Sequence, residues 1–378
     1  MTSPLTRHSP RPRRTVFYSV AAQWDNLGDI EIRNAALEWI RATGSDVIAY
    51  SGSMPPAYLA AFDADDSVRF VSSPVRYQLL LCAHLLRRRA SMVFAPGPQV
   101  FGPSAKALGK SLVNLANVAL VRASGGAVLA VGRSLRGRGE LAQRLEATIV
   151  SLFQQYVVRD TRSAEVLGRQ LVSAPDLAFA HDFPEAPMNR ARTDVVISLR
   201  GDRPVRLEGL RDVVAELRNQ GLNPVLVTQV KRDDEQHRAL GQTLDLPTVL
   251  WDDHSHTEQL DRARAAYAQA GAVLSNRLHA LIFGIQHGAA PIAVLDHGSD
   301  KLTSTLRPWV ALRTTSPDFD GLDGADWAGT DIVGPAGVVD GEAERARTAL
   351  EGVRDQFSRL LGGTEPTPAA VPAVGARA

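Results

Sequence analysis

A cation and an imidazole stand two residues apart in the segment AVLSNRLHALIFGIQHGAAPIAVLD, residues 272–296. A short apolar run reaches Ser275 and Asn276, either of which can cap a helix that begins near Arg277. The free N–H groups and the positive dipole end of such a helix attract an anion. Arg277 adds a planar fork that suits a carboxylate or a phosphate, and His279 can donate a proton. The pattern predicts a site for an anionic substrate; a histidine buried only for packing is the plain alternative.

Two further cations follow predicted strands. Arg159 lies near the end of the run YVVRD, and Lys301 follows the run PIAVLD through the loop HGSD. Each of them alone would be an ordinary surface charge. In an open parallel sheet, however, ligands bind outside the carboxyl ends of the strands. We therefore expect Arg159 and Lys301 to face a common cleft with Arg277 and His279.

The loop after the first predicted strand, AAQWDNLGDIEIRNAAL, holds three more candidates. Asn26, Gly28 and Asp29 stand just before the predicted helix. Gly28 permits a close approach of the backbone, and Asp29 can cap the helix. The alternative interpretation of this loop is a plain turn with a helix cap. The dinucleotide-binding signature G-x-G-x-x-G is absent after this strand.

Short apolar runs alternate with helical patterns along the chain and must position these residues. Strands are predicted at 15–20, 46–50, 91–96, 126–132, 156–160, 195–200, 223–230, 247–252, 272–276 and 291–296. Helices are predicted at 30–44, 75–89, 104–121, 139–153, 161–170, 206–221, 234–244, 256–271 and 278–288. Strand–helix alternation at this spacing predicts parallel sheets covered by helices. We expect an α/β fold with two Rossmann-like domains that face each other across a cleft.

Composition shifts mark the expected domain boundaries. The polar, proline-containing stretch HDFPEAPMNRARTD lacks periodicity and interrupts the alternation. The predicted units are a disordered basic arm (1–14), an N-terminal domain (15–183), a linker (184–194), a C-terminal domain (195–340), a late helix across the junction (341–361) and a disordered tail (362–378).

The bulk composition of the 378 residues is that of an ordinary globular protein, with 44% hydrophobic and 22% charged residues. The 42 Lys and Arg residues nearly balance the 41 Asp and Glu residues, so the global basic field of a nucleic-acid binder is missing. The single cysteine, Cys82, excludes an intramolecular disulfide and fits a reducing, cytoplasmic compartment. Its apolar surroundings predict a core position. The oligomeric state stays open.

Membrane and metal signals are weak in this sequence. The sequence has no run of 18 or more apolar residues, so we expect no membrane span. The basic cluster RPRR near the N-terminus permits a weak contact with anionic surfaces. The stretch DDHSH (252–256) looks ligand-like because His254 and His256 stand beside two aspartates. It also lies between a predicted strand and helix, where Asp and Ser are normal caps. We therefore predict neither a metal nor a cofactor.

Several stretches together resemble the polysaccharide pyruvyl transferases. These are NLGDIEI, YVVRDTRSAEVLG, SAPDLAF, VVISLRGD and LSNRLHALIFGIQHGAAPIAVLDHGSDK. The resemblance runs from about residue 15 to 310. The Arg-Leu-His-Ala block with its downstream Lys301 is the most specific of them. Relatives often carry Tyr-Asp-x-Lys before this lysine, where the present chain has LDHGSDK. The glycine-rich loop of the family is replaced by APGPQVFGP.

The resemblance implies a GT-B-like fold and transfer of pyruvate from phosphoenolpyruvate onto two hydroxyls of a sugar, with formation of a cyclic ketal. Phosphoenolpyruvate is an anion, so its site needs cations and helix ends. The reaction also needs a general acid for the methylene carbon and a base near the sugar. These demands assign His279 as the acid, Asp29 to the sugar side, and Arg159, Arg277 and Lys301 to the anion. Asn26 and Gly28 complete the predicted substrate-binding set. The resemblance also implies that the first domain holds the acceptor and the second holds the donor.

Two other classes of protein remain open at this point. A GT-B glycosyltransferase that uses a nucleotide sugar would share the architecture, and fold does not fix function. A catalytically silent glycan-binding protein is the second alternative. The sequence does not specify the acceptor sugar within the expected cell-surface glycan or glycan precursor.

Overall fold

The computed structural model describes residues 14–181, 192–295, 301–335 and 337–362. Its strands form two separate sheets in which all the neighbouring strands pair in parallel. The expected α/β architecture of two Rossmann-like units is confirmed. Three predicted segments lie outside the described residues: the arm up to residue 13, the linker from 184 to 191 and the tail from 363 onward.

The first sheet has the strand order β3-β2-β1-β4-β6-β7-β8, with β5 paired to the far end of β6. Its strands are β1 (Thr15–Ser19), β2 (Asp46–Tyr50), β3 (Val68–Val71), β4 (Ala90–Phe94), β5 (Gly97–Phe101), β6 (Val128–Gly137), β7 (Gln155–Val158) and β8 (Val172–Ser173). Its helices are α1 (Leu27–Arg41), α2 (Pro56–Leu59), α3 (Pro74–Leu86), α4 (Ala105–Ala123), α5 (Glu140–Ser151), α6 (Arg162–Leu167) and the 3₁₀ helix η1 (Leu177–Ala180).

The second sheet has the order β11-β10-β9-β12-β13-β14. Its strands are β9 (Asp194–Ser198), β10 (Asn223–Val227), β11 (Thr248–Val249), β12 (Ala270–Ser275), β13 (Ala290–Val294) and β14 (Arg313–Thr315). The helices are α7 (Leu207–Asn219), the 3₁₀ helix η2 (Lys231–Asp233), α8 (Asp234–Leu244), α9 (His256–Gln269), α10 (Leu278–Gln286), α11 (Lys301–Leu306) and α12 (Val338–Gly362).

Both sheets have a point at which the strand order reverses. In the first sheet the chain starts at β1 and moves outward on either side through β2 and β4; in the second it does so from β9 through β10 and β12. The loops that leave neighbouring strands at such a point diverge and leave a crevice at the carboxyl ends. At these points the loops after β1 and β12 lead into α1 and α10, and five of the seven predicted site residues lie there: Asn26, Gly28, Asp29, Arg277 and His279.

Alternation along the buried strands builds two layers of core on each sheet. In β1, Val16 and Tyr18 belong to a cluster with α1, whereas Phe17 points the other way, into a cluster with α3 and α4. In β9, Val196 packs toward α9 and α10, and Ile197 packs toward α7 and α8. The cluster that holds Val16 also holds Val196, so one apolar layer runs through both domains.

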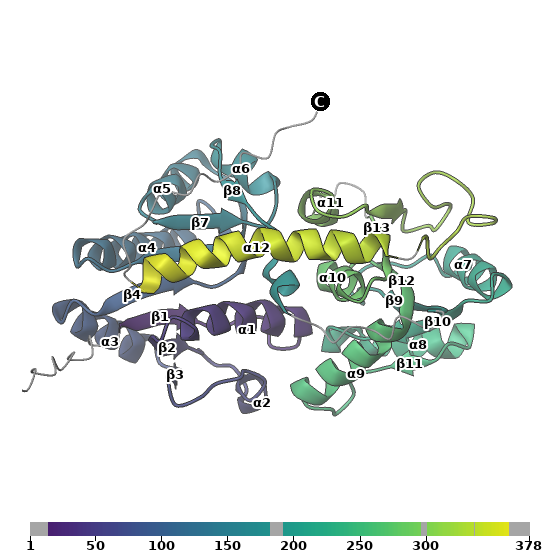
Figure 1. Ribbon diagram of the computed structural model, residues 1–378, viewed down its shortest axis with the longest axis horizontal. Helices are drawn as coiled ribbons and strands as arrows, with labels where there is room; N and C mark the ends of the chain where they lie inside the picture. Colours follow the sequence, from purple (N-terminus) through teal and green to yellow (C-terminus); the bar gives the residue numbers. More distant parts are fainter. Residues whose placement is uncertain (1–13, 182–191, 296–300, 336, 363–378) are drawn as a thin grey trace, which may run out of the picture.

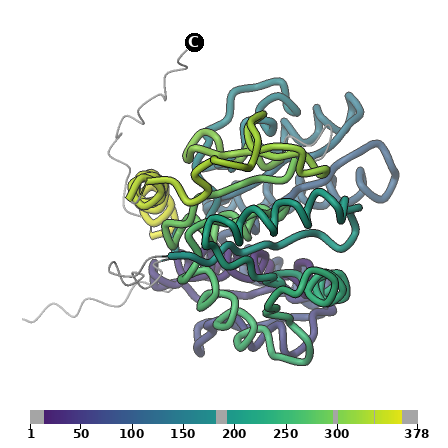
Figure 2. The backbone as a smooth tube through the Cα atoms, turned by 90° about the vertical axis from the view of Figure 1, so that its right-hand side faces the viewer, coloured from purple at the N-terminus to yellow at the C-terminus, as the bar shows by residue number. Residues whose placement is uncertain are grey.

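Backbone pairing and one long helix join the domains. Leu27 N donates to Gln229 O over 3.1 Å, and Lys231 N donates to Asp25 O over 2.9 Å. Helix α12 runs along both domains and contacts α1, η1 and α10 (Figure 1). In the perpendicular view it is seen end-on at one side of the molecule (Figure 2). The two domains are therefore held together by more than the chain connection.

Three expectations about local structure were wrong. Cys82 is exposed rather than buried, because α3 is apolar on its outer side as well as toward the sheet. The segment APGPQVFGP is not simply a loop, since Gly97–Phe101 within it form β5. Helix α1 begins at Leu27, so Gly28 and Asp29 lie inside it and not before it.

Candidate functional site

A cavity of about 170 Å³ lies between the two domains and collects most of the predicted residues. It is lined by Gln23, Asn26, Asp29, Pro98 and Arg159 from the first domain, and by Arg200, Asp202, Gln229, Arg232, Asn276, Arg277, Leu278, His279 and Lys301 from the second. The structure thus brings six of the seven predicted site residues to one cavity. The seventh, Gly28, lies directly beneath the imidazole of His279.

Gly28 is a glycine because His279 occupies the space of a side chain. A β-carbon at Gly28 would lie 1.9 Å from Nδ1 of His279, far closer than atoms can approach. Asn26 caps the helix instead of Asp29, since its Oδ1 accepts a hydrogen bond from Gly28 N over 3.1 Å. Asp29, in the first turn, has its Oδ1 3.3 Å from Nη1 of Arg33. The N-terminus of α1 therefore forms one wall against the histidine.

The other side of the imidazole faces a buried carboxylate that the sequence did not single out. Nε2 of His279 lies 3.8 Å from Oδ1 of Asp176, which is only 1% exposed. Burial by itself would raise the pKa of Asp176, but Arg159 and His279 hold it well below its usual range. Nδ1 makes no hydrogen bond within the described part of the chain. Nε2 is buried and likewise has no hydrogen-bond partner among the described residues, so Asp176 contacts the ring only as a nearby charge.

Asp176 also anchors Arg159, and a local turn holds the carboxylate. Nη1 of Arg159 donates to Asp176 Oδ2, and Ala178 N donates to Asp176 Oδ1 over 2.9 Å. Nε of Arg159 is buried without a hydrogen-bond partner among the described residues. Asp176 lies in the stretch SAPDLAF, one of those that resemble the family. A carboxylate directly before a short helix is therefore the sequence signal that could have identified it.

Arg277 is already engaged by a second buried carboxylate. Its Nε and Nη2 donate to Asp233 over 2.8 and 2.6 Å, and Asp233 is fully buried. Burial lowers the pKa of Arg277, while Asp233 opposes that change. The side of the guanidinium that we expected to bind the substrate is thus occupied by Asp233, and only Nη1 remains for a ligand. Helix α10 begins at Leu278 without a side-chain cap.

The two residues expected to cap α10 have other partners. Ser275 Oγ accepts from Arg277 N over 2.9 Å. Asn276 Oδ1 accepts from Arg200 N, also over 2.9 Å, and so ties the loop after β12 to the loop after β9. These bonds position the backbone at the point where the strand order reverses.

Two more arginines line the cavity, and sequence reasoning missed both. Arg200 pairs with Asp202 through bonds of 2.8 and 2.7 Å, and Arg232 pairs with Asp25 through bonds of 3.0 and 3.1 Å. Arg200 stands two residues after the end of β9 and could have been found by the strand-end rule that revealed Arg159. Arg232 lies in η2, and its partner Asp25 is in the opposite domain.

Lys301 differs from these arginines because no carboxylate within the described residues pairs with it. Burial of its ammonium group, followed by repulsion from Arg159, lowers its pKa to about 8. Asp29 acts in the opposite direction. The residue keeps solvent on one side, so water moderates the shift. Lys301 is the cation at this site with the most to gain from an anionic ligand.

Neutral donors complete the lining. The amide nitrogens of Gln23 and Gln229 are buried and have no hydrogen-bond partner in the described structure. Buried polar groups normally have a partner, so such atoms beside a cavity favour a polar ligand. The site therefore combines cations, amide donors and one imidazole, an arrangement suited to a small polyanion.

His256, considered as a metal ligand, has a structural partner instead. Its Nε2 hydrogen-bonds Trp24 O across the domain boundary over 2.8 Å, and its ring packs edge-on against Trp251. Burial lowers its pKa. Within the described ranges no group of three His, Cys, Asp or Glu residues could hold a metal ion.

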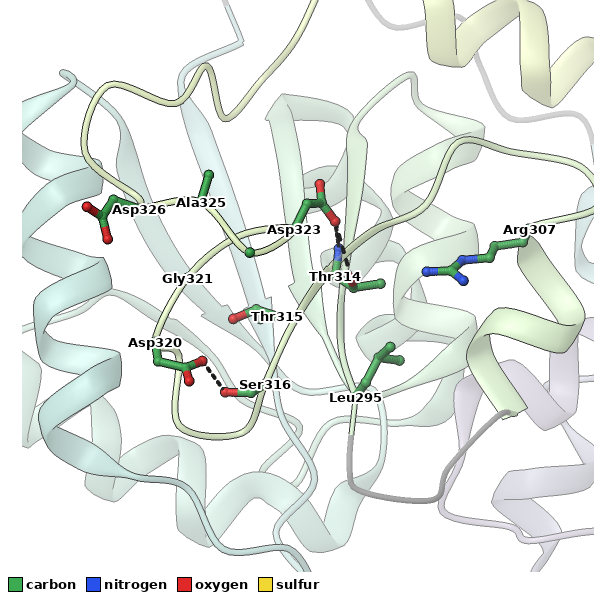
Figure 3. A pocket seen from close by; sticks show the side chains of 11 residues that line it. Leu295, Arg307, Thr314, Thr315, Ser316, Asp320, Gly321, Asp323, Ala325 and Asp326 are labelled. Carbon is green, nitrogen blue, oxygen red and sulfur yellow. Dashed lines mark hydrogen bonds between the residues drawn. The ribbon is translucent and has the colours of Figure 1, made fainter.

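A larger cavity, of about 700 Å³, lies elsewhere in the second domain. It is bounded by the ends of β13 and β14 and by the loop that contains Asp320, Asp323 and Asp326 (Figure 3). Ser316 and Thr314 hydrogen-bond two of these carboxylates. None of the predicted residues lines it. This cavity is the larger of the two, but the predicted site residues line the smaller one.

The two Rossmann-like domains form a fold of the GT-B type. A glycosyltransferase from Rickettsia africae ESF-5 is similar in structure, with a TM-score of 0.55, 11% identity, and coverage of 93% of this chain and 100% of that one. HepE (Alr3699) from Anabaena, in complex with UDP, is similar with a TM-score of 0.52, 10% identity and coverage of 93% and 100%. At these identities the likeness shows the fold alone.

The sequence matches the family described as polysaccharide pyruvyl transferase over residues 26–298. That match covers most of the chain, and the chain belongs to this family of transferase enzymes. The expected family is thereby confirmed. No match was found among curated proteins. Among the described helices, none combines the length and the apolar character needed to cross a membrane.

Proposed function

We propose that this protein transfers the enolpyruvyl group of phosphoenolpyruvate onto two hydroxyls of a sugar in a cell-surface glycan or its precursor. The observation that carries the proposal is the cavity in which His279, backed by Asp176, faces four arginines and Lys301. A carboxylate and a phosphate on one small donor need several cations at close range. The cavity offers them from both domains.

His279 is the proposed general acid. Protonation of the methylene carbon makes the neighbouring carbon electrophilic, and a sugar hydroxyl attacks it. Phosphate leaves, and the second hydroxyl closes the ketal. Of the two hydroxyl protons, one balances the proton gained by the new methyl group and the other leaves with the phosphate. Asp176 is a proposed positioning residue, because its carboxylate lies 3.8 Å from the imidazole and does not line the cavity.

The cations have separate proposed roles. Lys301 and Arg159 stabilise the anionic groups of the donor and the departing phosphate. Arg277 contributes through its remaining N–H groups, since Asp233 occupies the bidentate face. Asp29, with Asn26 and the N-terminus of α1, lies on the first-domain wall, where we place the sugar. Asp29 is the proposed base for a sugar hydroxyl.

Ligand choice tests this proposal against a nucleotide-sugar glycosyltransferase. Phosphoenolpyruvate at about 100 times its dissociation constant should stabilise the fold by about 2.7 kcal/mol. A uridine diphosphate sugar should leave the melting temperature unchanged. A phosphate-release assay with phosphoenolpyruvate and a panel of pyranosides then identifies the acceptor. Stabilisation by the nucleotide sugar alone would refute the proposal, and binding without turnover on any acceptor would favour a silent glycan-binding protein.

A further inference from the structure

One outer face of the first domain carries apolar side chains that nothing in the described structure covers. In α3, Val75, Leu79, Cys82 and Leu86 are exposed at a spacing of four, three and four residues, which places them along one side of the helix. Leu86 is 88% exposed, Val75 68% and Leu79 66%. A helix on the surface normally turns such a stripe inward. Here α3 buries its opposite side, around Leu81, against the sheet.

Helix α4 continues this face. Leu112, Val113 and Leu120 are exposed on it. Gln78 of α3 and Asn117 of α4 exchange two hydrogen bonds, of 2.7 and 3.2 Å, so the helices lie side by side. Together, α3 and α4 hold six of the eleven large hydrophobic side chains that are exposed in the described structure. We call the outer surface of these two helices the α3–α4 face.

The part of the chain that forms this face is strongly basic. Residues 67–139 contain eleven Lys and Arg residues and no Asp or Glu, although the whole chain has a net charge of only +1. The exposed cations at the ends of the two helices are Arg76, Arg87, Arg88, Arg89, Lys106 and Lys110. None of these six forms an ion pair with a described residue. Cations that flank an apolar surface indicate an anionic partner.

We propose that the α3–α4 face docks on an anionic phospholipid surface. Apolar side chains on a helix enter the boundary between headgroups and acyl chains, while flanking Lys and Arg residues contact the headgroups. A second copy of the chain is a poor occupant, because two faces without a single acidic residue repel each other. The inference rests on this surface alone and is independent of the reaction at the cleft.

Vesicle flotation with the full chain tests the proposal. The protein should float with vesicles of phosphatidylcholine and 30% phosphatidylglycerol, and it should bind pure phosphatidylcholine at least about tenfold more weakly. Added salt should release it, because screening weakens the contact with the headgroups. Equal binding to both kinds of vesicle, or binding to neither, would overturn the proposal.

Matched variants locate the contact. Leu79→Glu and the pair Lys106→Glu/Lys110→Glu should each weaken vesicle binding at least about tenfold with unchanged melting temperatures. The controls are Val338→Glu for the apolar change and Arg211→Glu/Arg354→Glu for the charge change, all at exposed positions on other helices. An equal loss of vesicle binding in the controls would show that the contact does not lie on the α3–α4 face. A dimer in light scattering that Leu79→Glu dissociates, without vesicle binding, would assign the face to a second copy.

Discussion

His279 is held between a carboxylate and a glycine, and that position defines its chemistry. Nε2 lies 3.8 Å from Asp176, and the other ring nitrogen, Nδ1, lies against Gly28. A histidine oriented by a buried carboxylate through one nitrogen acts as acid or base through the other. The competing interpretation is that His279 only hydrogen-bonds the donor phosphate.

Two substitutions of His279 separate these interpretations. His279→Ala should lower turnover at least about a hundredfold, the lower range for a general acid, with a modest change in donor binding. His279→Gln keeps a hydrogen-bonding group but cannot protonate carbon, so it should be similarly slow. Steady-state phosphate release measures both. Near wild-type turnover in the Gln variant would leave His279 a binding role only.

Lys301 should make donor binding dependent on pH. Its pKa in the empty protein is lowered to about 8, so it is charged below that pH and neutral above it. A bound anion favours the charged form. Binding must therefore take up a proton above pH 8, and affinity should fall about tenfold per pH unit there. Calorimetric titration of phosphoenolpyruvate between about pH 6.5 and 9.5 measures this dependence.

Lys301→Arg is the control for that dependence. Arginine stays charged across the whole range, so the decline of affinity above pH 8 should disappear even if the affinity itself changes. An unchanged decline in this variant would assign the titration to another group. A flat profile in the wild type would remove Lys301 from the donor site.

At the scale of the elements, the start of α1 and the start of α10 depend on each other. Gly28→Ala should displace the imidazole, because the new β-carbon would fall within 1.9 Å of Nδ1. We expect turnover to fall at least about a hundredfold, as for loss of the general acid. The control is Gly352→Ala in α12, where a β-carbon meets nothing within 4 Å. It should keep full activity and gain up to about 1 kcal/mol in stability.

The loop between β12 and α10 depends in a similar way on η2, because Arg277 in the loop pairs with Asp233 at the end of η2. Arg277→Ala leaves the buried Asp233 without its charged partner and should cost about 3–5 kcal/mol in stability. Arg277→Lys keeps the charge but loses the bidentate geometry. We expect both variants to raise the Michaelis constant for the donor, with the larger effect in Ala. Kinetics at a temperature where both variants are folded measure this, and equal constants in wild type and Arg277→Ala would exclude the residue from the site.

The sequence predicted where site residues stand along the chain, but not their partners. Arg159, Arg277 and His279 were singled out because each stands near the carboxyl end of a predicted strand, where ligands bind in parallel sheets. Asp233 was not, because it is 44 residues from Arg277 and follows a different strand. Cys82 was misplaced because periodicity does not tell which side of an apolar helix faces the sheet. Strand β5 was missed because Pro98 and the flanking glycines favour turns.

At the scale of the whole molecule, α12 links the two domains. Phe357 is buried, and its ring lies 5.8 Å from that of Trp39 in α1. Phe357→Ala should destabilise the protein by about 3–5 kcal/mol through the cavity that it leaves. Glu351→Ala, on the exposed side of the same helix, should change stability by less than about 0.5 kcal/mol. Chemical denaturation measures both, and equal midpoints would mean that α12 contributes little to the first domain.

The position of α12 also affects how the protein is made. The first domain's strands and helices are complete by residue 181, but the apolar side of α1 that α12 covers waits for residues up to 362. At about 5–20 residues per second, roughly 10 to 35 seconds of synthesis separate these two points. During that interval Trp39 has no Phe357 to pack against. The nascent chain therefore exposes an apolar surface to chaperones until its last helix has emerged from the ribosome.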